Sequence, residues 1–350
     1  MPLIALQAKL FTEPESLHAL AGEWQDLFRR CPGASSFQRP EWVLTWIDVF
    51  RPVHPFVIGV WYGSLLVGLA PLLVYQQEQN SVLAFVGGGV SDYLDMLIDP
   101  THLDEALTAI FDVIACHKQA WDKLDFTDLP QNSMLLRRCR GFAVEEHATC
   151  AVLQLPSSIQ GLSASVSSHK LRNYRNARRR LAEAGNFQVE IATEANLPIA
   201  LAALFRLHSD RWAQDGQSGV LSRAEVQLFH QRVASQLIST EVLTLYMLRL
   251  NGEIIATLYA LVESDAVYCY IQGYDPVYSK LSPGTFILGA VIEDAVRHQA
   301  NRIDFLRGRE SYKLSWGARE VPTFRAQISK SRFARLTAPL DRTVSQTRAE

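Results

Sequence analysis

Charged and hydroxyl side chains are concentrated directly after an apolar run near the C-terminus. Residues 303–306 have the pattern of a buried strand, and residues 307–313 that follow carry four charged side chains and a tyrosine. Because ligands of open α/β folds bind beyond the carboxyl ends of strands, this stretch is expected to border a ligand site. Glu310 has the chemistry of a general base, and Tyr312 that of an alternative general acid.

Four further side chains of this region are candidates for catalysis, orientation or binding. Asp304 lies within the predicted strand, as a third catalytic group, as the partner that orients Arg307, or as the cap of a neighbouring loop. Lys313 and Arg309, with Arg307 in support, are candidates to hold an anionic substrate or the phosphates of an acyl donor, because both cation types bind oxyanions. A surface cluster of ion pairs is the alternative interpretation.

A second candidate is a phosphate-binding helix start. A strand is predicted to end near Gln272, and Ser282, Pro283 and Gly284 open a helix. Free backbone amides and the helix dipole at such a start favour a phosphate group. A turn that only starts a helix is the alternative. The expected donor-binding residues are Lys280, Ser282, Gly284 and Thr285.

His208 and Arg211 are three residues apart on a predicted helix and therefore share a face. Both are candidates for substrate binding, and a partly buried structural histidine is the alternative for His208. No serine or cysteine near them lies in a recognisable nucleophile motif, so direct transfer between two bound substrates is favoured over a covalent intermediate. The nine histidines include no pair at ligand spacing, and no metal site is expected.

Residues 167–185 predict an amphipathic helix that begins at Ser167 and stops at Gly185. Six Lys and Arg side chains between residues 169 and 180 lie on the face of this helix opposite to its apolar face. Their positive charge is suited to binding an acidic polymer, tRNA or anionic lipid. A solvated helix face is the alternative. Residues 1–150 hold 18 acidic against 10 basic side chains, which argues against extended nucleic-acid binding without excluding tRNA.

The elements that position these groups are predicted to occur twice, each time as hairpin, strand, helix and strand. The hairpin turns are Gly63-Ser64 in the first copy and Asn251-Gly252 in the second. Leu-Asp-Phe at 124–126 and Ile-Asp-Phe at 303–305 fall at equivalent places. We interpret the pattern as a degenerate internal duplication, with coincidence as the alternative.

The composition fits a two-domain protein without a membrane anchor. A chain of 350 residues with 48% hydrophobic composition is too long for a single hydrophobic core, so two domains are expected. The five cysteines are odd in number and form no C-x-x-C pair, which favours a reducing cytoplasm. The longest apolar run, residues 65–74, is far below the ~20 residues of a membrane span, so no span is expected.

Four stretches, at residues 167–185, 207–212, 273–285 and 304–317, together resemble one group of enzymes. The resemblance is to the GNAT superfamily of acyltransferases, to its Fem-like double-GNAT branch, and within it to the BioF-like acetyltransferase domain of the cellulose-biosynthesis (CelD/BcsL-type) family. Ser91-Asp92-Tyr93 is similar to an acidic element of the family, which makes Asp92 a candidate for substrate binding.

The resemblance implies an α/β fold with mixed sheets and two GNAT-like acyl-CoA N-acyltransferase domains in tandem. It implies a degenerate domain at 1–155, a second at 156–330 with a helical insert at 165–238, and a flexible tail at 331–350. The implied reaction moves an acyl group other than aminoacyl, most simply acetyl, from acetyl-CoA or another acyl-CoA. The implied acceptor is an amine or hydroxyl of a small molecule, saccharide or polysaccharide precursor.

Two alternatives stay open beside this activity. One is a Fem-like transferase that takes its acyl group from aminoacyl-tRNA. The other is a non-catalytic GNAT-like module that binds polysaccharide. Both depend on the same observation: the predicted phosphate loop offers only Lys280 and one glycine, fewer basic and glycine residues than ordinary GNAT enzymes have there.

Overall fold

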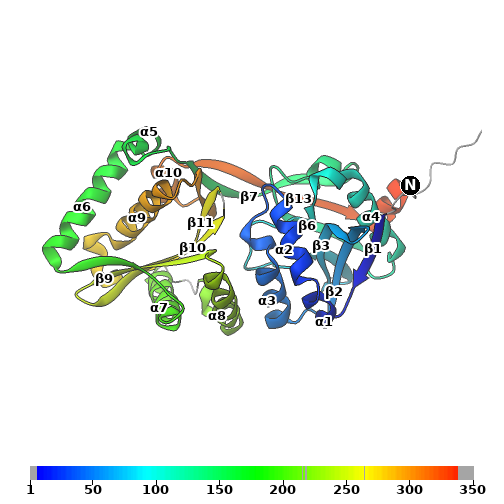
Figure 1. Ribbon diagram of the computed structural model, residues 1–350, viewed down its shortest axis with the longest axis horizontal. Coiled ribbons are helices and arrows are strands. Elements are labelled where there is room, and N and C mark those ends of the chain that lie inside the picture. Colours follow the sequence, from blue (N-terminus) through cyan, green and yellow to red (C-terminus); the bar gives the residue numbers. More distant parts are fainter. Residues whose placement is uncertain (1–5, 215, 217–218, 264, 338–350) are drawn as a thin grey trace, which may run out of the picture.

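A computed structural model describes residues 6–214, 216, 219–263 and 265–337 (Figure 1). Within these residues the chain forms one 13-stranded mixed sheet covered by helices, which agrees with the expected α/β class. The two separate sheets that were expected are joined, because strands from both halves of the chain pair in the middle. We call residues 6–154 the first half and residues 155–337 the second half.

The first half contains the predicted hairpin, strand, helix and strand. The hairpin β2–β3 is antiparallel, while β4 and β6 are parallel because helix α4 connects them. Helices α2 and α3 bury Trp24 and Trp42 on one face of the sheet, and α4 buries Ile110 on the other. The elements are β1 (Leu6–Phe11), α1 (Pro14–His18), α2 (Ala21–Arg30), α3 (Pro40–Phe50), β2 (His54–Tyr62), β3 (Leu65–Gln77), β4 (Asn80–Phe85), β5 (Leu97–Ile98), α4 (Leu103–Cys116), β6 (Lys123–Pro130) and β7 (Ala143–Gln154).

The second half repeats this order, which confirms the predicted duplication at the level of the fold. The hairpin β9–β10 turns at Asn251 and Gly252, both with positive φ, and β11 and β12 are parallel. The elements are α5 (Leu162–Ser165), α6 (Ser168–Ala184), β8 (Phe187–Ile191), α7 (Leu197–Gln214), α8 (Ala224–Ser239), β9 (Leu243–Leu250), β10 (Glu253–Glu263), β11 (Ala266–Tyr274), the 3-10 helix η6 (Pro276–Leu281), α9 (Pro283–Arg297), β12 (Arg302–Arg307), α10 (Ser311–Ser315), β13 (Arg319–Ser329) and α11 (Lys330–Thr337).

The expected helical insert at 165–238 is wrong in one respect. It is interrupted by strand β8, which pairs with β9 at the edge of the sheet. In the same way β1 pairs with β2 in the first half, and helices follow each edge strand. Helices α7 and α8 therefore correspond to α1–α3, while α5 and α6, which precede the edge strand β8, have no counterpart among the described residues before β1.

The two halves exchange strands at the centre of the sheet. Strand β7, from the first half, pairs with β12, and β13, from the second half, pairs with β6. The two long strands cross the middle of the molecule side by side, joined along their length (Figure 1). The boundary expected at residue 155 thus divides the chain without dividing the sheet.

The C-terminal segment is more ordered than expected. Residues 331–337 of the expected tail belong to helix α11, whose Phe333 is buried against Trp121 at a ring distance of 5.4 Å. Residues 338–350 of that expected tail lie outside the described residues. In the part of the chain that is described, no helix has both the length and the apolar character needed to cross a membrane.

Helices from both halves share one core below the sheet. Trp42 of α3 packs edge-on against Phe229 of α8 with ring centroids 4.9 Å apart. Arg39 donates to both carboxylate oxygens of Glu263 at 2.7 Å, and both side chains are nearly buried. These contacts fix the position of the second half against the first, which matters because the cavity described next is lined by residues of both.

Candidate functional site

A cavity of about 700 Å³ lies where strands β11 and β12 separate. Their parallel pairing ends at Tyr268 and Asp304. Beyond this point β12 bends away: its register against β7 shifts, and Leu306 has a φ of 58°, a left-handed conformation that is unusual for leucine. Asp304 holds the bend, because its Oδ1 accepts a hydrogen bond from the Leu306 amide at 2.8 Å.

The cavity reaches both faces of the sheet. Successive residues of β10 point to opposite sides: Leu258 joins the core under α6 and α9, and Tyr259 the core under α7 and α8. Leu288 of α9 and His208 of α7 both line the cavity. Two ligands can therefore approach the opening between β11 and β12 from opposite faces.

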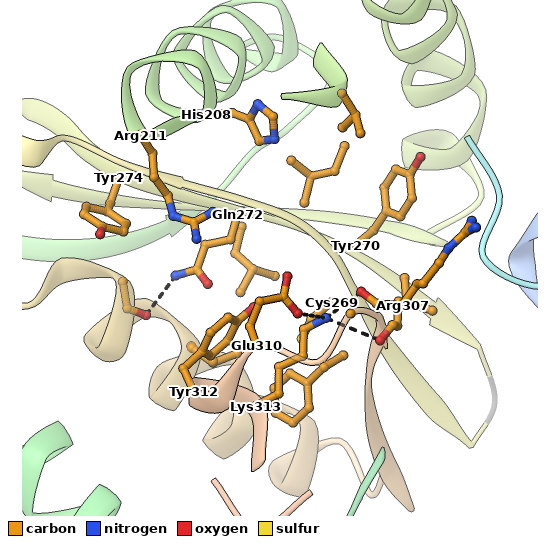
Figure 2. A pocket seen from close by; sticks show the side chains of 18 of the residues that line it. His208, Arg211, Cys269, Tyr270, Gln272, Tyr274, Arg307, Glu310, Tyr312 and Lys313 are labelled. Carbon is orange, nitrogen blue, oxygen red and sulfur yellow. Dashed lines mark hydrogen bonds and ion pairs between the residues drawn. The ribbon is translucent and has the colours of Figure 1, made fainter. Parts of the chain in front are cut away.

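The loop after β12 brings the predicted catalytic groups into the cavity. Gly308 turns the chain with a φ of 122°, and any side chain on it would collide with the Glu310 carboxylate. Lys313 is 3% exposed, and its Nζ lies 2.7 Å from the Arg307 carbonyl and 3.0 Å from Glu310 Oε2. Glu310, Tyr312 and Lys313 all line the cavity, with Lys313 holding the carboxylate in place (Figure 2).

Tyr312 and Cys269 line the same part of the cavity in their protonated forms. Burial raises the pKa of the Tyr312 phenol, and the nearby Glu310 carboxylate raises it further. Burial also raises the pKa of the Cys269 thiol. A thiol that stays protonated is a poor nucleophile, which agrees with direct transfer between two bound substrates.

Arg307 lines the cavity and joins the two halves. Its Nε donates to Asp92 Oδ1 at 2.9 Å, its Nη2 donates to the Ser91 carbonyl at 2.7 Å, and its Nη1 lies 3.3 Å from Asp128. Asp92 also lines the cavity, and burial raises the pKa of its carboxyl although Arg307 acts against the shift. The orientation of Arg307 thus comes from Asp92 and Asp128, not from Asp304 as the sequence suggested.

Asp304 and Arg309 do not line the cavity, contrary to their predicted roles. Asp304 faces the first half, where the Tyr93 hydroxyl donates to its Oδ2 at 2.9 Å. Burial raises the pKa of the Asp304 carboxyl to about 6. Arg309 is directed to β7, with two hydrogen bonds to Thr149 Oγ1. Asp304 is therefore a positioning residue for the bend in β12.

The start of α9 borders the cavity through Ser282, Gly284 and Thr285. Gly284 packs closely against β11, since a Cβ there would lie 3.1 Å from the Gln272 side chain, whose amide donates to the Gly284 carbonyl. Gly284 thus makes room for the protein's own side chains. Lys280 is exposed on η6 and is not among the residues that line the cavity, so its predicted role is not supported.

Arg180 of α6 lies beside the helix start through Ser282, although it is not among the residues that line the cavity. Its Nη2 donates to Ser282 Oγ at 2.8 Å, and its buried Nε has no hydrogen-bond partner among the described residues. The sequence placed Arg180 in a basic helix but gave no sign that it differs from its neighbours there. Helix α6 itself is as predicted, with Ser167 accepting from the Lys170 amide and Gly185 at its end.

On the other face, α7 contributes His208, Arg211 and Trp212 to the cavity. Burial lowers the pKa of His208 to about 4, so the imidazole is neutral near pH 7. Lys170 of the predicted basic helix also lines the cavity, and further lining residues that the sequence did not single out are Gly89, Val90, Trp212, Tyr270 and Trp316. Trp212 directly follows Arg211, and its aromatic type beside a candidate binding residue was the one available signal.

The described residues contain no group of three or more His, Cys, Asp or Glu side chains that could hold a metal ion. The cavity is lined by the carboxylate of Glu310, the neutral phenol of Tyr312 and the start of helix α9. This arrangement suits proton transfer beside a bound anionic ligand.

Comparisons with known proteins concern the family match and the fold of the chain. A family model described as an acetyltransferase (GNAT) domain matches residues 168–314. The structure of FemX is similar with a TM-score of 0.68 at 12% identity, covering 95% of this chain and 99% of that one. A search of curated proteins found no match.

Two other solved structures share the fold. One is the C-terminal domain (DUF2156) of a putative lysylphosphatidylglycerol synthetase from Agrobacterium fabrum, with a TM-score of 0.59, 12% identity and coverage of 91% and 94%. The other is L-PGS from Bacillus licheniformis, with a TM-score of 0.58, 12% identity and coverage of 90% and 91%. The chain therefore has a Fem-like GNAT-type fold, and its residues 168–314 match the family model described as a GNAT acetyltransferase domain.

Proposed function

We propose that the cavity is the site of acyl transfer from an acyl thioester, most simply acetyl-CoA, to an amine or hydroxyl of a small molecule or saccharide. One observation carries the proposal. Glu310, Tyr312 and the start of α9 meet in a cavity that opens on both faces of the sheet. A donor on the α9 face and an acceptor on the α7 face can then react in a ternary complex, where orientation supplies much of the rate.

The residues at the α9 start fit the diphosphate of a CoA donor. A helix N-terminus attracts phosphate through its free amides and dipole, and the hydroxyls of Ser282 and Thr285 add donors. Arg180 adds a positive charge whose Nε has no acceptor among the described residues. From there the pantetheine chain would follow β11 to Glu310. The edge of β11 that faces β12 has no paired strand residue beyond Tyr268.

The chemical step follows from the side chains in the opening. Glu310 takes the proton from the acceptor amine, whose nitrogen attacks the thioester carbon. A C–N bond forms, the C–S bond breaks, and the sulfur leaves as a thiolate that is protonated by Glu310 or water. A free thiol has a pKa of about 8.5, below that of tyrosine. Because burial raises the pKa of Tyr312, its hydroxyl stabilises the thiolate as a hydrogen-bond donor instead of as the predicted general acid.

A transferred aminoacyl group is a second candidate. The fold is shared with FemX and with the domain of a lysylphosphatidylglycerol synthetase, so excluding aminoacyl groups, as the sequence interpretation did, has no support. The exposed basic side chains of α6, among them Arg172 and Arg175, would then contact the phosphates of tRNA. That donor predicts binding that weakens steeply with salt. The non-catalytic module predicts ligand binding without turnover.

Calorimetric titration with acetyl-CoA and desulfo-CoA tests the donor. The wild type is expected to bind both in the micromolar range. Arg180→Gln should raise both dissociation constants about tenfold, because a charge-assisted hydrogen bond is lost. Arg179→Gln is the matched control. Arg179 directly precedes Arg180 on α6, is exposed and lies beside Glu183.

The outcomes separate the CoA donor from the tRNA donor. No binding to the wild type at millimolar CoA, with binding of a charged tRNA that 0.5 M salt abolishes, would replace the CoA donor by the tRNA donor. Equal losses in Arg180→Gln and Arg179→Gln would show that the contact is diffuse attraction to α6, and the assigned diphosphate position would be abandoned.

A further inference from the structure

Four cationic side chains line the cavity, and two of them have an anionic partner. Arg307 is paired with Asp92, and Lys313 with Glu310. Lys170 lies 5.6 Å from the ring centroid of Trp316 and stacks on it. Arg211 has no hydrogen bond or ion pair with any residue that the structure describes. Its guanidinium carbon lies 5.2 Å from the ring centroid of the adjacent Trp212.

Arg211 reaches from α7 into the reacting part of the cavity. Figure 2 shows its guanidinium directed away from the helix toward Gln272, in the same space as Glu310 and Tyr312. Its positive charge acts on the Tyr312 phenol. A cation that enters a half-buried cavity without an anionic partner is available to a negatively charged ligand.

Two neighbours of Arg211 also lack partners. His208 is 4% exposed, and neither its Nδ1 nor the Trp212 Nε1 has a hydrogen-bond partner among the described residues. A turn at Gly219 packs against both rings and holds them over the cavity. Arginine and tryptophan only donate hydrogen bonds, so the group that satisfies them must accept. Buried donors of this kind are normally paired, by protein, water or ligand.

The face of the sheet on which Arg211 lies indicates whether it binds the acceptor or the acyl donor. Helix α7 packs on the face opposite to α9 and Arg180, where the donor diphosphate is placed. On the α7 side Arg211 is the one lining cation without an anionic partner among the described residues, which matches a single negative charge better than a phosphate dianion. The planar guanidinium suits a carboxylate, which it can bind through two parallel hydrogen bonds.

We propose that Arg211 binds the carboxylate of the acceptor, and that the acceptor is an amino-carboxylic acid such as an amino acid. The inference rests on the proposed acyl transfer, for which the acceptor amine faces Glu310. Arg211 and Glu310 would then bind the two ends of one zwitterionic substrate. The product is an N-acyl amino acid and free thiol.

Matched pairs of ligands test the inference without a donor. Binding of L-phenylalanine and phenethylamine, and of L-ornithine and putrescine, is measured by saturation-transfer NMR and calorimetry. At least one amino acid is expected to bind tenfold or more tightly than its partner amine. Arg211→Gln should abolish that difference by weakening the amino acid alone.

Two controls separate the possible causes. Arg206→Gln changes an arginine of the same helix that is paired with Asp210 and Asp275 outside the cavity, and it should leave both ligands unaffected. Acetyl-CoA binding should be equal in wild type and Arg211→Gln. A tenfold loss of acetyl-CoA binding in Arg211→Gln with unchanged amino-acid binding would make Arg211 a donor contact and overturn the proposal.

The remaining outcomes are equally decisive. If every amino acid binds like its amine, or none binds at all, the acceptor assignment is wrong while acetyl-CoA binding still supports acyl transfer. If acetyl-CoA does not bind but amino acids bind through Arg211, the carboxylate site stands and the CoA donor is the part that fails.

Discussion

The guanidinium of Arg307, in the second half, lies 2.9 Å from the carboxylate of Asp92, in the first half, at the edge of the cavity. Asp128, also from the first half, lies 3.3 Å from the same guanidinium. One cation thus satisfies two carboxylates that would otherwise repel each other. Because Arg307 and Asp92 come from different halves and both line the cavity, the shape of the cavity depends on how the two halves pack against each other.

Replacing Arg307 by glutamine should destabilise the protein by about 2–3 kcal/mol. The change leaves Asp92 and Asp128 without their cation, and the expected cost is below that of a fully buried pair because Arg307 is 39% exposed. Denaturant unfolding measures the effect. Arg309→Gln, at an exposed site bound to Thr149, should change the free energy of unfolding by less than about 0.5 kcal/mol. Equal effects would show that Arg307 contributes no specific pairing.

Replacing Glu310 by glutamine should lower kcat about 100-fold or more, since the amide cannot accept the amine proton. The dissociation constant of acetyl-CoA should not change. Thiol release with the best acceptor of an amine panel measures kcat, and calorimetry measures binding. Glu320→Gln, an exposed carboxylate beside Arg309, is the control and should keep full activity. A loss of donor binding equal to the loss of kcat would instead give Glu310 a role in binding.

Asp304 should make the protein less stable as the pH rises from about 4 to about 6. Burial raises the pKa of its carboxyl from 3.8 to about 6, so the folded state holds a proton that the unfolded state has released in this interval. By linkage, this part of the stability is present at low pH and lost as the pH passes the folded pKa, on the order of 3 kcal/mol.

Asn at position 304 has no such proton. The difference in unfolding free energy between wild type and Asp304→Asn should therefore change across pH 4–6, with the wild type losing stability relative to the variant. Urea unfolding at several pH values measures it. A difference that is flat with pH would mean that Asp304 is ionised throughout, and the assignment of a protonated, positioning carboxyl would be wrong.

Gly289 of α9 is expected to be needed for packing, unlike other helical glycines. A Cβ on Gly289 would collide with the Tyr174 ring of α6. Gly289→Ala should cost about 1–3 kcal/mol by overpacking. Gly22 of α2 has open space around it, and Gly22→Ala should stabilise by about 0.5 kcal/mol through helix propensity. Thermal unfolding of the two variants measures both signs. A Gly289→Ala protein as stable as wild type would show that α6 is not tightly packed on α9.

The sequence predicted the repeated order of strands and helices and the position of the cavity. Short-range signals sufficed, such as the Gly63-Ser64 and Asn251-Gly252 turns and the charged stretch after β12. Glu310, Tyr312 and Lys313 line one cavity because they lie within four consecutive residues, at the N-cap and in helix α10. The role of Tyr312 changed, since its pKa depends on burial that no local pattern reveals.

Contacts between distant segments could not be predicted in the same way. The pairing of β13 with β6 joins residues about 200 positions apart, and nothing in either strand specifies its partner. Asp304 contacts Tyr93 and Arg307 contacts Asp92, and both contacts depend on the bend in β12 and on a loop of the first half. Arg180 looks like the other arginines of α6 in sequence, and its distinct role comes from the position of Ser282.

A crystal structure of the protein with acetyl-CoA or desulfo-CoA tests the central claim most directly. The account predicts the pantetheine chain in the opening between β11 and β12, its sulfur end beside Glu310 and Tyr312, and its diphosphate at Ser282 and Arg180. CoA bound elsewhere, or an empty opening in crystals soaked at saturating CoA, would contradict the claim that this cavity is the site of acyl transfer.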